Sequence, residues 1–141
     1  MKEKYREQWE KLGSDDPYWA VLTDPNKKGG KWSAEEFFKT GKEEIEDILS
    51  RLSKLGINPG RGVALDFGCG VGRLSRALAR EFQKVIALDI SSSMLKEARK
   101  VNYGIENIEF THNTSEYLKT IPESSIDFLY SNIVLQHGVG A

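Results

Sequence analysis

The chain has 141 residues, of which 39% are hydrophobic and 29% are charged, and this composition is typical of one compact globular domain with its own core. The net charge is −1 with acids and bases interspersed, which does not give the basic face of a nucleic-acid-binding protein. Apolar runs are shorter than the ~20 residues that cross a bilayer, and residues 1–6 are too charged for a signal peptide. A single cysteine excludes an internal disulfide and favours a cytoplasmic location.

The N-terminal part, residues 1–41, is predicted to be a helical and lid-like segment that precedes the main domain at 42–141. Residues 2–12 have the spacing of a short charged helix, whereas residues 13–32 contain Asp-Pro and Gly-Gly pairs that are typical of a loop. This loop is unusually rich in apolar residues, so it either packs on the core or forms a flap over a ligand. These residues are Tyr18, Trp19, Val21, Leu22 and Trp32.

A helix is predicted to begin after Ser33. Ser33 and Glu36 have the Ser-x-x-Glu spacing of a capping box, in which each side chain satisfies the backbone N–H of the other residue. The helix is expected to continue to about Leu55, either without a break or interrupted near Thr40-Gly41. Its buried stripe recurs at steps of three and four residues and consists of Ile45, Ile48, Leu49, Leu52 and Leu55.

After residue 60, short apolar runs alternate with helical patterns. This alternation predicts an α/β fold, a parallel sheet with helices on both faces. The predicted strands are 62–67, 84–89, 107–111 and 126–131, and the predicted helices are 72–81, 92–101 and 115–120.

The fourth predicted strand is followed by only a short apolar stretch and a glycine-containing tail. An apolar strand at an open sheet edge tends to pair with another chain. Two interpretations follow: the sequence is a fragment of a larger domain, which is favoured, or it is a short protein that forms homo-oligomers through the exposed edge of this strand.

Three glycines follow the first apolar strand at alternate positions: Gly68, Gly70 and Gly72. Glycine permits positive φ and lets a ligand approach the backbone closely, so the turn has the character of a binding loop. The spacing differs from the dinucleotide-binding fingerprint and from the phosphate-binding P-loop, which disfavours an NAD-type protein. A tight strand–helix turn without a ligand remains the structural alternative.

Two acids end the first two strands. Asp89 closes the second strand, where a carboxylate can accept hydrogen bonds from both hydroxyls of a ribose. Its alternative role is the N-cap of the next helix, although the serines at 91–93 already supply capping oxygens. Asp66 lies on the same rim and could instead accept hydrogen bonds from loop N–H groups.

Three ordered segments of this sequence resemble the class I S-adenosylmethionine-dependent methyltransferases, in particular the bacterial small-molecule type. They are residues 65–73, residues 85–99 and residues 125–137. The resemblance implies a Rossmann-like sheet of order 3-2-1-4 and methyl transfer from S-adenosyl-L-methionine to an unidentified, small-molecule acceptor. Family members continue through three more strands, so the chain is interpreted as the cofactor-binding half, truncated after the fourth strand. The alternative is a non-catalytic S-adenosylmethionine-binding or regulatory module.

The resemblance also implies roles for individual residues. Asp89 corresponds to the ribose ligand, and Ile90 and Met94 to residues that pack against adenine. The family often has Asp where this chain has Thr114, so Asn113 is an alternative adenine contact. The full set of implied cofactor-binding residues is Asp66, Gly68, Cys69, Gly70, Arg73, Asp89, Ile90, Met94, Thr114, Ser115, Ser131 and Asn132. Of these, Asp66, the backbone of 68–70, Ser131 and Asn132 are expected at the methionine end.

No catalytic residue can be assigned. The cofactor carries an already activated methyl group, so the protein needs no nucleophile of its own. Cys69 is therefore expected to be a packing residue. His137 is either a general base or a structural residue, and His112 is expected at the surface. Two separate histidines and one cysteine do not form a metal-ligand cluster.

Overall fold

The computed structural model describes residues 33–114, 117, 119–122 and 125–131. Predictions for the N-terminal helix at 2–12, the loop at 13–32, Ser115, Asn132 and His137 lie outside these residues. The described elements are, in chain order, α3 (Ala34–Lys54), β1 (Val63–Phe67), α4 (Arg73–Glu81), β2 (Lys84–Asp89), α5 (Ser92–Val101), β3 (Ile108–His112) and β4 (Phe128–Tyr130).

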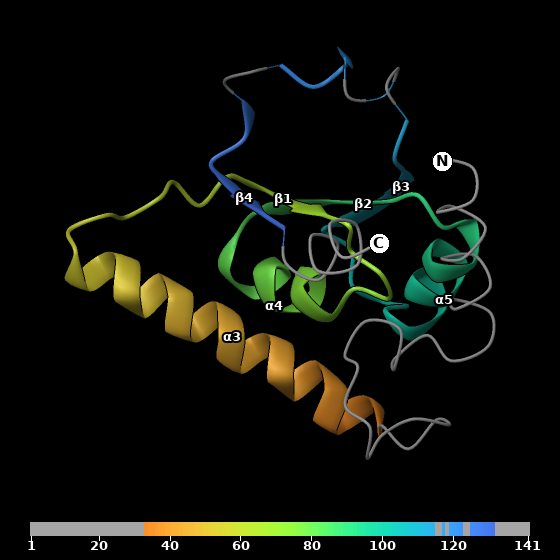
Figure 1. Cartoon of the computed structure of the whole chain (residues 1–141), viewed down its shortest axis with the longest axis horizontal. Helices are drawn as coiled ribbons and strands as arrows, with labels where there is room; N and C mark the ends of the chain where they lie inside the picture. The colour runs from red at the N-terminus through yellow and green to blue at the C-terminus, as the bar shows by residue number, and fades with distance from the viewer. Residues whose placement is uncertain (1–32, 115–116, 118, 123–124, 132–141) are drawn as a thin grey trace, which may run out of the picture.

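The four strands form one parallel sheet of order β3-β2-β1-β4, as predicted (Figure 1). The register places Asp66 of β1 beside Ala87 of β2 and Tyr130 of β4. Parallel strands end at the same edge of a sheet, so the carboxyl ends of β1, β2 and β4 lie together. This is the edge at which open α/β sheets bind ligands.

Helix α3 begins as the capping box predicts, because the Ser33 hydroxyl accepts a 3.1 Å hydrogen bond from the Glu36 N–H. The helix is continuous through Thr40 and Gly41, so the interruption considered for this point does not occur. A Cβ atom at Gly41 would overlap the Arg73 carbonyl oxygen. The glycine therefore allows close approach of α3 to the start of α4. The predicted division at residue 41 falls within α3 and stays a prediction.

The described helices α3, α4 and α5 lie on one side of the sheet, and the described parts of the connection between β3 and β4 lie over the other side (Figure 1). The helix-side core joins Ile45 and Leu49 of α3 to Leu78 of α4 and Val85 of β2. On the opposite face, a smaller cluster packs against the connection. It contains Leu65, Ile86 and Leu88, with Tyr117, Ile121 and Ile126 against them.

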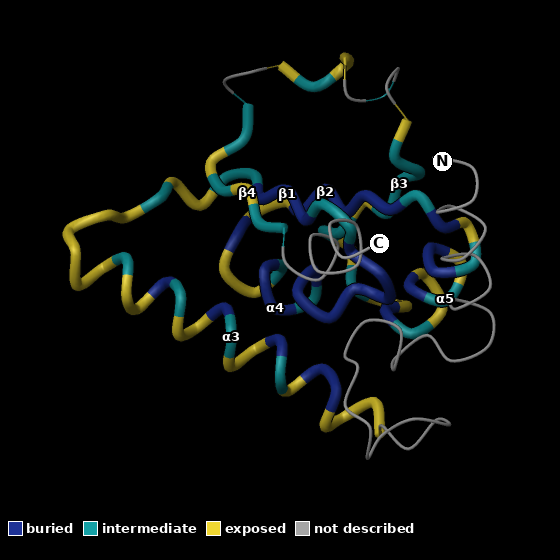
Figure 2. The backbone as a smooth tube through the Cα atoms, viewed as in Figure 1, coloured by how far each residue is buried: buried dark blue, intermediate teal, exposed yellow. Residues whose placement is uncertain are grey.

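Burial is greatest in β1, β2 and the turn that follows β1 (Figure 2). Several polar or charged residues are buried here and in the elements that follow: Asp66, Arg73, Ser75, Asp89, Ser91 and Asn102. Buried charges are uncommon unless they are paired or functional, so this group marks the candidate site. Within the described residues, no helix is long and apolar enough to span a membrane.

Candidate functional site

The glycine turn folds back over the end of β2. Gly68, Gly70 and Gly72 have φ values of 77°, 56° and 88°, in the left-handed region that other residues rarely adopt. The N–H groups of Gly68 and Cys69 both donate to the Leu88 carbonyl, at 2.7 and 2.8 Å. The alternation of glycines therefore reflects a backbone that reverses tightly.

The Asp89 carboxylate braces this turn. Its Oδ2 accepts a 2.8 Å hydrogen bond from the Gly70 N–H, and its Oδ1 accepts one of 2.8 Å from the Ser91 N–H. The N-cap of α5 is Ser91, whose hydroxyl accepts from the Met94 N–H at 3.2 Å. The alternative of Asp89 as the helix cap is therefore wrong, and its carboxylate lies between the glycine turn and the loop after β2.

Asp66 is buried beneath the same turn. Only 2% of the residue is exposed, and its hydrogen-bond partner is the Ser75 hydroxyl at 2.6 Å rather than a loop N–H group. Burial raises the pKa of Asp66 to about 6, although Ser75 and the nearby Arg73 oppose the shift. A carboxyl whose pKa is raised in this way is typical of a functional site.

Arg73 points toward α3. Its Nη2 pairs with Glu44 Oε1 at 3.0 Å, and its Nη1 donates to Thr40 Oγ1 at 3.3 Å. Glu44 Oε2 also accepts a 2.5 Å hydrogen bond from the Tyr130 hydroxyl. Burial, with the neighbouring Glu44, raises the pKa of Tyr130, so this hydroxyl stays protonated and acts as a donor.

Sequence reasoning identified Arg73 but missed its partners. Glu44 occupies one position of a helix rich in acidic residues, and nothing in the local pattern distinguishes it from Glu43 or Glu46. Tyr130 is an ordinary strand residue in the sequence. Only the parallel pairing of β1 with β4, with α3 packed nearby, brings these side chains together.

Cys69 is 4% exposed. Burial raises the pKa of its thiol, and the carboxylates of Asp89 and Asp66 raise it further. The thiol is therefore protonated at neutral pH, which agrees with its interpretation as a packing residue.

The residues expected near adenine lie around the ends of β2 and β3. Ile90 is half-buried and Met94 is fully buried. His112 Nε2 lies 3.0 Å from the Ile90 carbonyl oxygen, so this histidine ties the two loops together. Thr114 is exposed, and its hydroxyl accepts from the Tyr117 N–H at 3.0 Å. Asn113 extends the strand pairing by donating its N–H to the Asp89 carbonyl.

Ser131 follows β4 at the methionine end of the expected site. Its hydroxyl oxygen is buried and has no hydrogen-bond partner among the described residues, and the same holds for Arg73 Nε. Buried polar atoms are rarely left unpaired, so both atoms are suited to a ligand. The described part of the chain contains no group of three or more His, Cys, Asp or Glu residues that could hold a metal ion.

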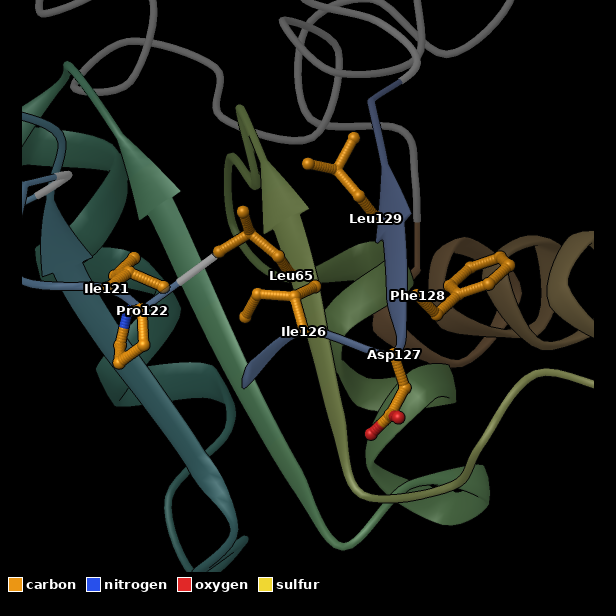
Figure 3. A pocket seen from close by; sticks show the side chains of 7 residues that line it. All are labelled: Leu65, Ile121, Pro122, Ile126, Asp127, Phe128 and Leu129. Atoms are coloured by element: carbon orange, nitrogen blue, oxygen red, sulfur yellow. The ribbon is translucent and has the colours of Figure 1, made fainter. Parts of the chain in front are cut away.

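A separate hollow of about 350 Å³ lies on the sheet face opposite the described helices (Figure 3). Its walls are almost entirely apolar: Leu65, Ile121, Pro122, Ile126, Asp127, Phe128 and Leu129. The one acid, Asp127, accepts a hydrogen bond from the Val63 N–H at 2.8 Å. Side chains alternate along a strand, so Leu65 faces this hollow whereas Asp66 faces the helices. The hollow is therefore distinct from the polar site.

Comparison with known proteins defines the class. A model of the methyltransferase domain matches residues 64–140. The chain belongs to this family, and its fold is that of the class I S-adenosylmethionine-dependent methyltransferases. The predictions of the family, the fold class and S-adenosyl-L-methionine as the cofactor are confirmed.

Curated relatives include phosphoethanolamine N-methyltransferase 1 of Triticum aestivum, 37% identical over 99 residues, which are 68% of this chain and 19% of the relative. Trans-aconitate 2-methyltransferase of Afipia carboxidovorans is 31% identical over 107 residues, 74% of this chain and 40% of the relative. The chain thus spans well under half the length of these relatives.

Solved structures show the same fold. Magnesium protoporphyrin IX methyltransferase from Synechocystis PCC 6803, with bound S-adenosylhomocysteine, matches with a TM-score of 0.59 and 25% identity, over 96% of this chain and 59% of that chain. Phosphoethanolamine N-methyltransferase 1 of Haemonchus contortus matches with a TM-score of 0.60 and 17% identity, over 97% of this chain and 27% of that one.

Proposed function

We propose that this chain is the cofactor-binding half of an enzyme that transfers a methyl group from S-adenosyl-L-methionine to a small molecule. The observation that carries the proposal is the pair of buried acids, Asp66 and Asp89, at the ends of adjacent strands beside a left-handed glycine turn. A non-catalytic module that binds the same cofactor is the alternative. An acceptor-dependent methyl transfer by the whole protein distinguishes the two.

The proposed residue roles are those that the family resemblance implies, and the position of Asp89 supports them. Asp89 is proposed to accept hydrogen bonds from the ribose hydroxyls, because each of its oxygens can accept from a ligand as well as from the backbone. Ile90, Met94, Thr114 and Ser115 are proposed to surround the adenine. The methionine end is assigned to Asp66, Gly68, Cys69, Gly70, Arg73, Ser131 and Asn132.

The chemistry proposed needs no protein nucleophile. When bound, the cofactor supplies a methyl group on a positively charged sulfur, which an acceptor attacks in line. The protein contributes orientation and a site that excludes water. Asp66 in its ionised form places a negative charge near the positively charged end of the ligand, and the protonated Cys69 thiol takes no part in bond formation.

The acceptor is proposed to be a small metabolite. The relatives are named for phosphoethanolamine, trans-aconitate and a malonyl group on an acyl carrier protein, which are small or carrier-bound anionic molecules. A cytoplasmic location is proposed from the single cysteine in the sequence.

Calorimetric titration with S-adenosylhomocysteine tests the proposed site. Micromolar binding by the wild type is expected, with no binding of NAD at the same concentrations. Asp89→Ala is expected to weaken binding at least tenfold, since it removes a charged hydrogen-bond acceptor, which is worth about 1.5–3 kcal/mol. Asp47→Asn on the exposed side of α3 is the control. A folded Asp89→Ala variant with unchanged affinity contradicts the ribose assignment.

As the alternative to a larger domain, we propose that the edge of β4 pairs with a second copy of the chain. β4 contacts only β1 within the described sheet, and Leu129 is 61% exposed beside the apolar hollow of Figure 3. Leu129→Lys is expected to convert a dimer into a monomer in light-scattering measurements. A wild type that is monomeric at 100-fold the concentration used for binding assays contradicts this assignment.

A further inference from the structure

One carboxylate of α3 joins two segments that approach the predicted methionine end of the site. Glu44 Oε1 pairs with Arg73 at the start of α4, and Glu44 Oε2 accepts from Tyr130 at the end of β4. Thr40, one turn earlier in α3, accepts a second hydrogen bond from the Arg73 guanidinium. The orientation of Arg73 is thus set by α3 rather than by its own helix.

Stability alone does not account for this network. The apolar residues Phe37, Ile45 and Leu49 already bury one side of α3. Burying an ion pair gives little or no net stability, because both charges lose their hydration. A 2%-exposed arginine whose two hydrogen-bond partners both lie on α3 is therefore better explained by a requirement for one orientation.

Two of the three guanidinium nitrogens are engaged, and the third is not. Arg73 Nε is buried and has no partner among the described residues, and the Ser131 hydroxyl, one residue after Tyr130, is in the same condition. Asp66, which is buried and interacts electrostatically with Arg73, supplies a negative charge nearby. An unpartnered guanidinium N–H near a carboxylate matches a group that carries both a carboxylate and an ammonium.

We infer that Glu44 is a positioning residue, which holds Arg73 and the end of β4 so that Arg73 Nε and the Ser131 hydroxyl face the amino-acid end of the cofactor. The inference rests on the proposed function. Glu44 itself is not proposed to contact the ligand. Its effect is confined to the amino-acid end, and the nucleoside end depends on Asp89 and the loops after β2 and β3.

Because the effect of Glu44 is limited to the amino-acid end of the cofactor, two ligands can test it. S-adenosylhomocysteine carries the amino-acid end, whereas adenosine lacks it. Glu44→Gln is expected to lower the affinity for S-adenosylhomocysteine about tenfold and to change the affinity for adenosine less than about twofold. Glu43→Gln is the matched control, because Glu43 is an exposed neighbour whose contact with Lys39 is 3.9 Å long, and it is expected to change neither affinity.

The outcomes separate the inference from the proposed function. An equal loss of affinity for both ligands indicates a purely structural role for Glu44 and overturns the inference, as does an unchanged affinity for S-adenosylhomocysteine. If the wild type binds neither ligand, the proposed function fails and the inference fails with it.

A milder variant covers the case in which Glu44→Gln does not fold. Tyr130→Phe removes only the hydroxyl that donates to Glu44 and keeps the ring that packs beside Phe128. It is expected to weaken S-adenosylhomocysteine about threefold with adenosine unchanged. A folded Tyr130→Phe variant with the wild-type ratio of the two affinities overturns the inference on its own.

Discussion

Asp66 is expected to lower the stability of the unliganded chain at neutral pH. Burial raises its pKa from 3.8 to about 6. The folded-state pKa lies above the unfolded value, so the folded chain binds the proton more tightly. The contribution of this group to stability is therefore largest below about pH 4, falls as the pH rises to about 6, and stays low above that.

The size of the effect follows from the shift. A difference of roughly two pKa units, at 1.36 kcal/mol each, corresponds to about 3 kcal/mol at pH 7.5 and to about 1 kcal/mol at pH 4.5. Asp66→Asn keeps the shape of the side chain and removes the ionisation, and the Ser75 hydroxyl can still donate to the amide oxygen. The variant is expected to be more stable than the wild type by up to about 3 kcal/mol at pH 7.5.

Urea unfolding followed by circular dichroism measures this difference at both pH values. Comparing variant with wild type at each pH cancels the titration of all other groups. Asp47→Asn is the control, because Asp47 is exposed and its one ion pair among the described residues is with Arg51, and it is expected to change stability by less than about 0.5 kcal/mol. Asp66→Asn with a stability equal to or below that of the wild type at pH 7.5 would refute the reasoning.

Further predictions concern the ligand, the helix contact and the thiol. The affinity for S-adenosylmethionine is expected to fall as the pH drops below about 6, because the protonated Asp66 no longer attracts a cation. Calorimetry from pH 5 to 8 with wild type and Asp66→Asn checks this, and the affinity of the variant should not change with pH. Gly41→Ala is expected to destabilise the fold by about 1–3 kcal/mol, because its Cβ would overlap the Arg73 carbonyl, whereas Lys42→Ala should be nearly neutral; equal melting temperatures would contradict the close approach. Alkylation of Cys69 by iodoacetamide is expected to be at least about a hundredfold slower in the native protein than in urea, and comparable rates would show that the thiol is accessible.

The sequence predicted the sheet well because its signals are local. Each strand is a short apolar run, and an acid ends each of the first two, so the positions of Asp66 and Asp89 could be read directly. The left-handed turn at Gly68, Gly70 and Gly72 was equally visible, because no other residue adopts these angles at so little cost. These features depend on neighbours in the chain.

The structure corrected the sequence-based predictions for residues whose roles depend on contacts between distant elements. Gly41 suggested a break in a helix, yet it permits contact with Arg73, 32 positions later in the numbering. Asp89 was considered as a cap, yet its carboxylate binds the Gly70 N–H. In both cases the residue type indicated a special role. The contact partner could not be predicted, because it lies on another element of the fold.

Glu44 of α3 is a further case in which a contact between distant elements, rather than a local pattern, decides the role of a residue. The glycine turn and the two acids form the part of the proposed site that β1, β2 and the turn between β1 and α4 supply. The proposed methionine end also needs β4 and α4 held at a fixed separation, and β4 pairs over three residues in the described part of the chain. Such a short strand is weakly fixed by its own backbone hydrogen bonds. A hydrogen bond from Tyr130 to Glu44, and an ion pair from Glu44 to Arg73, supply the missing constraint. The helix that precedes the sheet is thus proposed to contribute to the geometry of the site without lying at the edge where the ligand is expected.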